Sequence, residues 1–344
     1  MILGDLGADI IKVERPGLGD ETRGWGPPFD ATGESAYFLS VNRNKKSLAA
    51  DLADVRDRSL LLELMRQADI VLENFLPGSL ERLGLDPKKL VEENPSLIWC
   101  TISGFGPDST RPGYDFVVQA ECGWMSITGE IEGPPMKIGV ALADVIGGKD
   151  AAIAILAAVV ARDQRQLDPR ERRIQISLAD SARAALVNVA QNVLISGVDA
   201  ARWGNAHPNL VPYQLFDAAD RSLVIAVGTD GQWRACANAL DLQQLVDDPA
   251  LRTNAGRVQQ RDRVVSAMSE RLREVAAQYW IDRLQKVSVP CGLVRTVAEA
   301  LEGTDANPLT GVRSSVPGSV RLPPPRLDEH GESIRSLGWR AFLR

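Results

Sequence analysis

The first half of the chain alternates short apolar segments with a segment of helical periodicity. Residues 8–14, 69–75 and 97–103 are rich in β-branched and other apolar side chains, and Gly or Pro follows each within two residues, which predicts buried strands. Residues 58–68 place apolar side chains at the 3.6-residue period of an amphipathic helix. This alternation predicts an α/β fold with a doubly wound parallel sheet.

A helix of unusual composition follows. Residues 144–162 carry Ala, Ile and Val on every side of the predicted helix, so we expect it to be buried on all its faces. Residues 173–178 predict another strand, and residues 180–195 predict another helix.

The composition and hydrophobic pattern of the chain change after Gly197. Residues 198–220 are irregular and contain Gly, Asn, His and Pro, which predicts a linker. Residues 221–309 are mostly helical, with a strand expected over 223–227, and they predict a smaller α+β domain. The preceding residues 1–197 then form a larger domain. A length of 344 residues is in keeping with two domains.

The composition limits the classes of function that fit this chain. Hydrophobic residues make up 44% of the chain and charged residues 24%, so a sizeable core can form. A net charge of −6 argues against nucleic acid as a partner, and no apolar run approaches the roughly 20 residues that cross a membrane. The four cysteines lie far apart without CxxC spacing, which favours reduced core thiols in a cytoplasmic protein.

Only two histidines are present, His207 and His330, and this excludes several kinds of active site. The sequence has no HExxH zinc motif, no histidine cluster and no GxSxG nucleophile turn, so no metal site is expected. A carboxylate, a thiol or a backbone amide is therefore expected to carry any chemistry.

Asp144 is the first candidate for that chemistry. It stands at the expected start of the apolar helix, next to several glycines. One interpretation is that Asp144 only caps the helix, a role that Asp favours and that is worth about 1 kcal/mol. The other is that it acts as a covalent nucleophile, with helix amides and closely approaching glycine backbone around the substrate.

Several polar segments are candidates for binding phosphates. The segment Asn42, Arg43, Asn44 and Lys45 concentrates amides and cations before a predicted strand, and it is either a polar turn or a phosphate clamp. Arg15, which follows a predicted strand, and Arg82, at the end of the segment 77–81, can join it.

Two further segments stand where a ligand can bind. Asn74 and Phe75 end a predicted strand and are either a turn and a core residue or a surface for an adenine or pantetheine group. Tyr114 and Asp115 open a helix, and Asp115 is either its cap or part of a site.

The segments LGDLGADIIKVERPGLGDETRGWGPPF, NRNKKSLAADL, ADIVLENFLPGSLERLGL, GYDFVVQA, SITGEIEGPPMKIGVALADVIGG and VPCGLV together resemble the family III CoA-transferases, the CaiB/BaiF group. The resemblance covers nearly the whole chain in the same order. It implies a Rossmann-like large domain completed by residues 310–344, a small inserted domain, and a homodimer of two interlocked rings. The resemblance also implies that the family's first strand and its loop are missing before Met1.

The resemblance also implies roles for individual residues. Asp144 is expected to form aspartyl anhydride and aspartyl-CoA thioester intermediates, with coenzyme A or acyl-CoA as substrate and no permanent cofactor. The residues expected against coenzyme A are Arg15, Asn42, Arg43, Asn44, Lys45, Asn74, Phe75, Leu76, Arg82, Pro112, Gly113, Tyr114 and Asp115.

The substrate class follows from two comparisons within this fold. The related α-methylacyl-CoA racemases use a histidine where this chain has Tyr114, and racemisation needs a group on each side of the α-carbon, so a transferase is favoured over a racemase. The segment around Arg202 and His207 resembles the succinate–hydroxymethylglutarate CoA-transferase branch. Both residues are candidates to bind the distal carboxylate of a dicarboxylic acid, or else they structure the linker. An inactive CoA-binding protein is the alternative from another function class.

Overall fold

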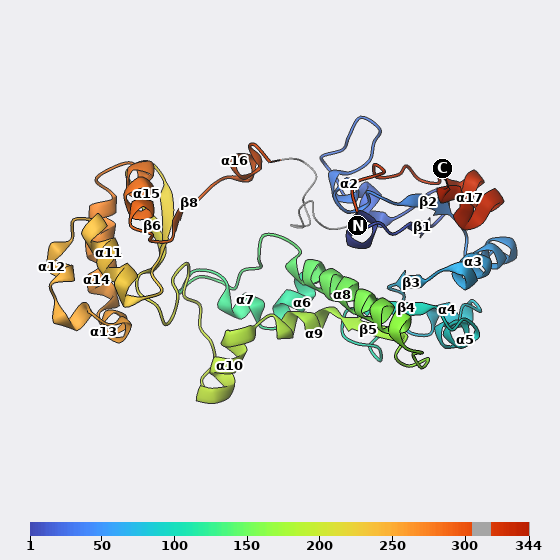
Figure 1. Ribbon diagram of the computed structural model, residues 1–344, viewed down its shortest axis with the longest axis horizontal. Helices are drawn as coiled ribbons and strands as arrows, with labels where there is room; N and C mark the ends of the chain where they lie inside the picture. The colour runs from blue at the N-terminus through green and yellow to red at the C-terminus, as the bar shows by residue number, and fades with distance from the viewer. Residues whose placement is uncertain (305–317, 344) are drawn as a thin grey trace. The chain divides into compact units, whose positions relative to one another are not determined.

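The computed structural model describes residues 1–304 and 318–343, which divide into two compact units. Unit 1 comprises residues 1–123, 139–191 and the described residues after 317; unit 2 comprises residues 124–138 and 192–304. Figure 1 shows both units, with labels on many of their helices and strands. The helix α10 (Val187–Ser196) crosses the boundary between the units.

Unit 1 is an α/β unit whose strand pairs run parallel. The strand β1 (Ile11–Glu14) pairs with β2 (Lys46–Ala49), and β4 (Ile98–Ser103) lies between β3 (Ile70–Glu73) and β5 (Arg173–Ser177). The parallel strands are therefore hydrogen-bonded as two sheets, of two and three strands. The helical segments of unit 1 are α1 (Ile2–Asp5), η1 (Glu21–Gly24), α2 (Ala36–Val41), α3 (Val55–Gln67), α4 (Ser79–Arg82), α5 (Pro87–Glu93), α6 (Asp115–Glu121), α8 (Leu142–Gln164), α9 (Leu178–Ala184), α17 (Gly331–Leu337) and η3 (Gly338–Phe342).

The three-stranded sheet carries helices on both faces. Neighbouring residues of a strand point to opposite faces, and Trp99 and Cys100 of β4 show this directly. Trp99 packs with Leu85, Leu90 and Val91 of the α5 region, whereas Cys100 packs with Ala151 and Ile155 of α8. Figure 1 shows α8 running along this sheet. The expected α/β fold with parallel strands and helices on both faces is confirmed at this sheet.

The predicted strands at 8–14, 69–75, 97–103 and 173–178 are confirmed as β1, β3, β4 and β5. The expectation that the apolar helix is buried on all faces is wrong for the described chain. Ile153 and Val160 of α8 are 65% and 55% exposed. The reason is that α8 packs against β4 and β5, while α9, α6 and α1 cover only part of its remaining surface.

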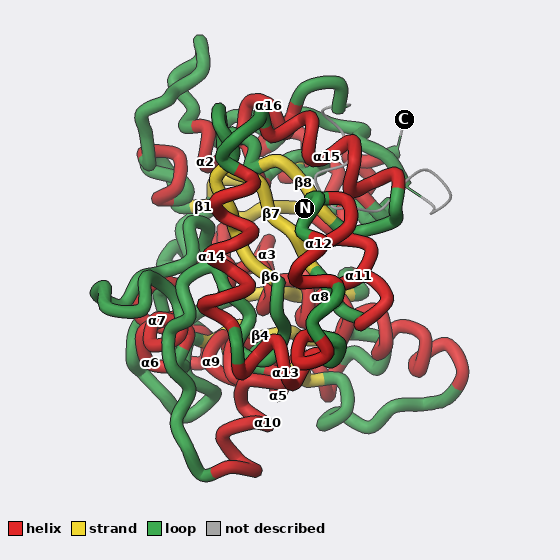
Figure 2. The backbone as a smooth tube through the Cα atoms, turned by 90° about the vertical axis from the view of Figure 1, so that its left-hand side faces the viewer, coloured by secondary structure: helices red, strands yellow, loops and turns green. Residues whose placement is uncertain are grey.

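Unit 2 is built on an antiparallel sheet in which β7 (Ser222–Ala226) lies between β6 (Tyr213–Asp217) and β8 (Cys291–Leu293). Figure 2 shows these strands in yellow beside red helices. The helical segments of unit 2, apart from α10, are α7 (Trp124–Ile127), α11 (Asp230–Ala239), α12 (Gln243–Val246), η2 (Pro249–Leu251), α13 (Asn254–Gln259), α14 (Arg261–Leu272), α15 (Ala277–Lys286) and α16 (Val297–Leu301).

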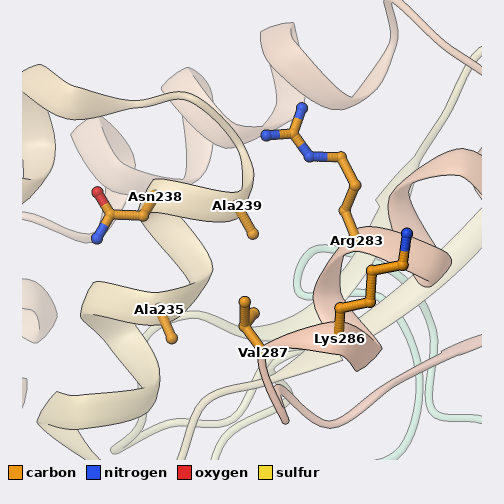
Figure 3. A pocket seen from close by; sticks show the side chains of 6 residues that line it. All are labelled: Ala235, Asn238, Ala239, Arg283, Lys286 and Val287. Atoms are coloured by element: carbon orange, nitrogen blue, oxygen red, sulfur yellow. The ribbon is translucent and has the colours of Figure 1, made fainter.

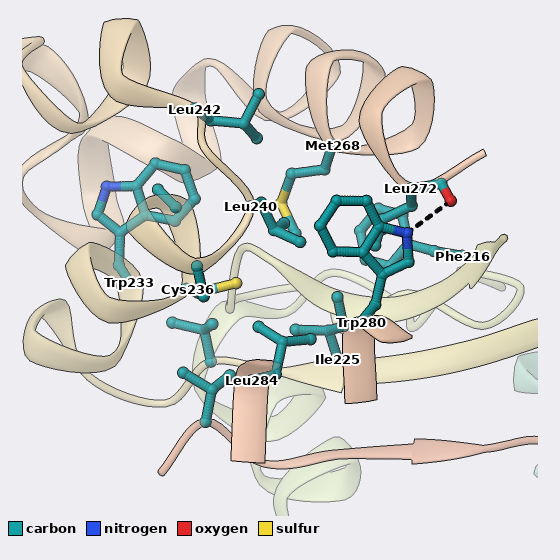
Figure 4. Close-up of a cluster of buried hydrophobic side chains, with 14 of the residues drawn as sticks. Phe216, Ile225, Trp233, Cys236, Leu240, Leu242, Met268, Leu272, Trp280 and Leu284 are labelled. Carbon is teal, nitrogen blue, oxygen red and sulfur yellow. Dashed lines mark hydrogen bonds between the residues drawn. The ribbon is translucent and has the colours of Figure 1, made fainter. Parts of the chain in front are cut away.

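The core of unit 2 is held around two tryptophans. Trp233 of α11 and Trp280 of α15 are almost completely buried, together with Met268 of α14 (Figure 4). The indole of Trp280 donates a hydrogen bond to the Leu272 carbonyl at 2.9 Å, so burying this polar group leaves no unpaired donor.

The four cysteines are unpaired, and three of them are buried, as expected for core thiols. No helix of the described chain combines the length and the apolar character that a membrane crossing requires.

Candidate active site

Asp144 lies in the first turn of α8, but it is not the cap of that helix. The N-cap residue is Ala141, whose side chain makes no capping hydrogen bond. The amide of Ala143 instead donates to Oδ1 of Asp115 at 2.8 Å, so a carboxylate from another helix satisfies the helix end. The interpretation in which Asp144 only caps α8 is therefore wrong.

The carboxylate of Asp144 is available for chemistry. Within the described chain it has no hydrogen-bond or ion-pair partner, and the residue remains exposed on one side. Partial desolvation, followed by the negative charge of Asp115, raises the pKa of Asp144 to about 6. The group is thus ionised at neutral pH and is also more basic than an ordinary Asp side chain.

Asp115 is held by contacts on both of its oxygens. Besides the Ala143 amide on Oδ1, Oδ2 accepts a hydrogen bond from Nε2 of Gln119 at 2.7 Å. Gln119 is fully buried and stands one helical turn after Asp115 on α6. Asp115 is therefore a fixed negative charge beside the start of α8.

A close approach of two backbones fixes the turn before Asp115. A Cβ atom on Gly104, just after β4, would lie 2.3 Å from the Cα of Gly113, and one on Gly113 would lie 2.1 Å from the Cα of Gly104. Only glycine fits at both positions. This contact holds Tyr114 and Asp115 at the carboxyl-terminal edge of the parallel sheet, where open α/β sheets bind ligands.

Sequence reasoning missed Tyr37 and Trp25. Desolvation, and then the negative charges of Asp144 and Asp115, raise the pKa of the Tyr37 hydroxyl, so Tyr37 lies within electrostatic range of both carboxylates. The ring of Trp25 packs edge-on against Tyr37 with centroids 5.1 Å apart. More than one hundred residues separate Tyr37 from Asp144, and no local pattern signals their proximity.

The segment from Asn42 to Lys45 is paired with other parts of unit 1. Arg43 forms a salt bridge with Asp5 at 2.7 Å, and both side chains are nearly buried. The side chain of Asn44 donates to Asp5 and accepts from the amides of Arg321 and Leu322.

The other two members of this segment pair locally. The amide of Asn42 donates to the Phe38 carbonyl, and the Lys45 amine donates to the Asn42 side chain at 2.8 Å. Burial, then the charge of Lys12, lowers the pKa of Lys45 to about 8.

The remaining residues expected near coenzyme A are mostly on the surface of unit 1. Arg15 follows β1 and pairs with Glu21 at 3.2 Å, with both side chains more than 60% exposed. Asn74, Phe75 and Leu76 are exposed at the carboxyl end of β3. The other exposed members of the set are Arg82 on α4, and Pro112 and Tyr114 before α6.

The two candidates for substrate recognition belong to unit 2. The guanidinium of Arg202 donates to the carbonyls of Glu130, Ser126 and Gly133, so it holds the end of α7 and the loop after it. His207 accepts a hydrogen bond on Nδ1 from the Asn209 amide at 3.0 Å.

A hollow of about 420 Å³ in unit 2 lies between α11 and α15 (Figure 3). Its lining includes Arg283 and Lys286, but Arg283 is already bound by both oxygens of Asp241. This hollow contains no nucleophile or acid, so it is not the candidate site. Among the described residues no group of three or more metal-ligating side chains is present.

The chain is similar to known proteins over most of its length. A sequence model described as CoA-transferase family III matches residues 1–330. The chain is 39% identical to succinyl-CoA:glutarate CoA-transferase of Mus musculus, over 97% of this chain and 81% of that protein. It is 39% identical to succinate–glutarate CoA-transferase of Agrobacterium fabrum, over 97% and 89%. A crystal structure of a CaiB/BaiF family protein from Brucella suis is similar with a TM-score of 0.83 and 38% identity, over 97% and 93% of the two chains.

Proposed function

This chain belongs to CoA-transferase family III, and we propose that it moves coenzyme A from succinyl-CoA to a dicarboxylic acid, with Asp144 as the covalent nucleophile. The observation that carries the assignment is the Asp144 carboxylate, which is ionised at neutral pH, unusually basic and unpartnered within the described chain. The names of the relatives supply the donor and the dicarboxylic acceptor.

The proposed reaction passes through two covalent intermediates at Asp144, a mixed anhydride and a thioester. A carboxylate oxygen of Asp144 attacks the thioester carbonyl and expels coenzyme A thiolate, which leaves a mixed anhydride. The thiolate then attacks the aspartyl carbonyl of the anhydride, releasing the donor acid and leaving an aspartyl-CoA thioester. The acceptor carboxylate attacks this thioester, and the same steps in reverse release the new acyl-CoA and restore Asp144.

The surroundings of Asp144 support this chemistry. Each tetrahedral intermediate carries negative charge on oxygen, and the N-terminal end of the 23-residue helix α8 carries a partial positive charge. The Tyr37 hydroxyl, which lies within electrostatic range of the same carboxylates, is a further candidate donor for that oxygen. Partial desolvation, and then the nearby negative charge of Asp115, keep the Asp144 carboxylate basic, because both disfavour its ionised form.

We assign coenzyme A to the carboxyl-terminal edge of the parallel strands. The exposed cations Arg15 and Arg82 suit its phosphates, and the exposed Phe75 and Leu76 suit its apolar parts. Asn74, Pro112, Gly113 and Tyr114 complete this surface. The segment Asn42–Lys45 borders it mainly as a structural support, because its side chains already have partners.

We further propose that the protein is a homodimer, in the interlocked-ring form expected from its family, and that it is cytoplasmic. Helix α10 has no buried residue, and its Leu194 and Ile195 are 77% and 78% exposed. Such apolar surface favours burial against another chain. Four unpaired cysteines favour a reducing compartment.

The function is tested by trapping the intermediate. Wild-type protein incubated with succinyl-CoA should acquire a hydroxylamine-sensitive adduct on the peptide that contains Asp144, as measured by mass spectrometry. Asp144→Asn should form no adduct, and Asp163→Asn, at the far end of the same helix, should form it normally. An adduct on a cysteine would contradict the proposal.

A further inference from the structure

The strongest unassigned group in unit 1 is the carboxylate of Glu73, the last residue of β3. Its Oε1 accepts hydrogen bonds from the indole Nε1 of Trp99, at 3.2 Å, and from the hydroxyl of Thr101, both on β4. Its Oε2 accepts one from the backbone amide of Phe75 at 2.7 Å. Both oxygens are therefore used, and their bonds join two neighbouring strands to the segment that follows β3.

The core of unit 1 fixes the position of this carboxylate. Glu73 stands opposite Thr101 in the parallel register, and Trp99 precedes Thr101 by two residues, so the three side chains share one face of the sheet. Trp99 is almost completely buried and belongs to the same hydrophobic cluster as Leu80 of α4. A buried indole N–H needs an acceptor, and Glu73 supplies it.

The loop 74–78 between β3 and α4 is thereby anchored at both ends. At its start, Glu73 holds the amide of Phe75, and beyond its end Leu80 is buried in the cluster around Trp99. Between these anchors, Phe75 and Leu76 are 44% and 51% exposed. Side chains so exposed gain little from packing, so the backbone bond to Glu73 decides where they stand.

We propose that Glu73 is a positioning residue for coenzyme A: it holds the Phe75 backbone so that the exposed Phe75 and Leu76 side chains are already in place for the apolar part of the ligand. The inference rests on the proposed function for the identity of that ligand. A surface ordered before binding loses less conformational entropy when the ligand arrives, so its affinity is higher. Glu73 itself takes no part in the acyl exchange.

The test uses Glu73→Gln in the whole chain. The glutamine carbonyl can replace only one carboxylate oxygen, and in the place of Oε1 it satisfies both Trp99 and Thr101. The glutamine NH₂ group then meets the Phe75 amide, donor against donor, and that bond is lost. The variant therefore keeps the bonds to the core and removes the one to the loop.

We expect Glu73→Gln to weaken the binding of coenzyme A by about tenfold in isothermal titration calorimetry, because a charge-assisted hydrogen bond is lost. The KM for succinyl-CoA should rise by a similar factor, whereas kcat should change by less than about twofold, because the ordered surface is remote from the reacting carbonyl. Glu92→Gln, which changes an exposed carboxylate on α5, is the matched control and should bind normally. Unchanged coenzyme A binding by Glu73→Gln would overturn the proposal.

A double-mutant cycle separates positioning from a general loss of stability. If Glu73 acts through the loop, Glu73→Gln should cost much less coenzyme A affinity in a Phe75→Ala background than in the wild type. Thr101→Val removes one donor to Glu73 and keeps the bond to Phe75, so it should lower the melting temperature and leave binding unchanged. An equal loss in both backgrounds, or equally weak binding by Thr101→Val, would overturn the proposal. Glu73→Asp, which keeps the charge on a shorter side chain, replaces Glu73→Gln in the cycle if the latter does not fold.

These results are separate from the chemistry at Asp144. Wild-type protein that binds coenzyme A through the ordered loop but forms no Asp144 adduct would contradict the proposed function and retain this inference. Wild-type protein that forms the adduct, together with a Glu73→Gln variant that binds coenzyme A equally well, would retain the function and overturn the inference.

Discussion

The segment Asn42–Lys45 and the first turn of α8 are both polar parts of unit 1, and they differ in how completely their charges are paired. Arg43 is nearly buried and bound to Asp5, and Asn44 bonds to Asp5 and to the backbone near Arg321. Asp144 has no such partner within the described chain, and its pKa is raised to about 6.

The comparison shows that one set of charges supports the fold and the other is available for reaction. A paired and buried ion stabilises the fold only as long as its partner remains, and removing one partner leaves the other uncompensated. An unpaired carboxylate beside a second negative charge weakens the fold slightly but stays reactive. Both regions are candidates for chemistry on their sequence alone, and the pairing of their charges in the structure distinguishes them.

The largest expected effect is on turnover at Asp144. Asp144→Ala should lower kcat by at least about a thousandfold, because the covalent route is lost, while the affinity for coenzyme A changes little. Steady-state kinetics with succinyl-CoA and glutarate, together with calorimetric binding of coenzyme A, measure both quantities. Asp163→Ala serves as the control on the same helix. Retained transfer by Asp144→Ala would remove Asp144 from the reaction.

The next effect is on stability at Arg43. Arg43→Met should lower the free energy of unfolding by about 3 kcal/mol, since Asp5 is left nearly buried without its cation. Urea denaturation measures this change, and Arg56→Met, whose arginine is 93% exposed, should have almost no effect.

In contrast to Arg43, Arg15 is expected to affect substrate binding and not stability. Its exposed side chain should add little to stability, and Arg15→Ala should instead raise the KM for succinyl-CoA by about tenfold. If Arg43→Met raises this KM and leaves the unfolding free energy unchanged, the contrast between the two regions fails.

A smaller effect is expected in the pH profile. The nucleophile must be ionised, so kcat/KM should fall as the pH drops through about 6. Asp115→Asn preserves an acceptor for the Ala143 amide but removes the negative charge, so the acid limb should move to lower pH by less than one unit. An unchanged limb would mean that the charge of Asp115 does not act on Asp144.

The smallest effect is on the pH dependence of stability. The pKa of Asp144 is about 6 in the folded protein and about 3.9 in an unfolded chain, so the folded state binds the proton more tightly. The carboxylate therefore destabilises the fold increasingly as the pH rises from about 4 to about 6, and the penalty persists above it. Asp144→Asn should raise stability at pH 8 by less than about 1 kcal/mol, since the group is partly solvated. Melting temperatures at pH 4 and pH 8 test this, and an equal difference at both would refute it.

Much of the secondary structure of unit 1 could be predicted, because the strands have clear local signals in the sequence. The apolar runs that became β3 and β4 have turn residues directly after them, and the helix α3 follows a clear amphipathic period. The strands β6 and β8 were missed, since β8 has only three residues next to a proline and β6 lies within the segment expected to be a linker. The exposure of Ile153 could not be predicted, because composition does not reveal which face of a helix is covered.

The candidate site likewise contains residues that the sequence could predict and contacts that it could not. Asp144 was found from its position near a helix start and from the motif around it. The support of Asp115 by Gln119 follows an i, i+4 spacing that the sequence does contain. The approach of Tyr37 and the pairing of Arg43 with Asp5 depend on tertiary folding, so no local pattern could have predicted them.

The close approach of Gly104 and Gly113 also has a consequence for substitution at the two positions. A methyl group at either position collides with the backbone of the other, so the first alanine must push the two segments apart. A second alanine then enters space that has already opened, and the double variant loses less stability than the two single variants together. The two positions are therefore expected to constrain each other, because each glycine is required by the backbone of the other.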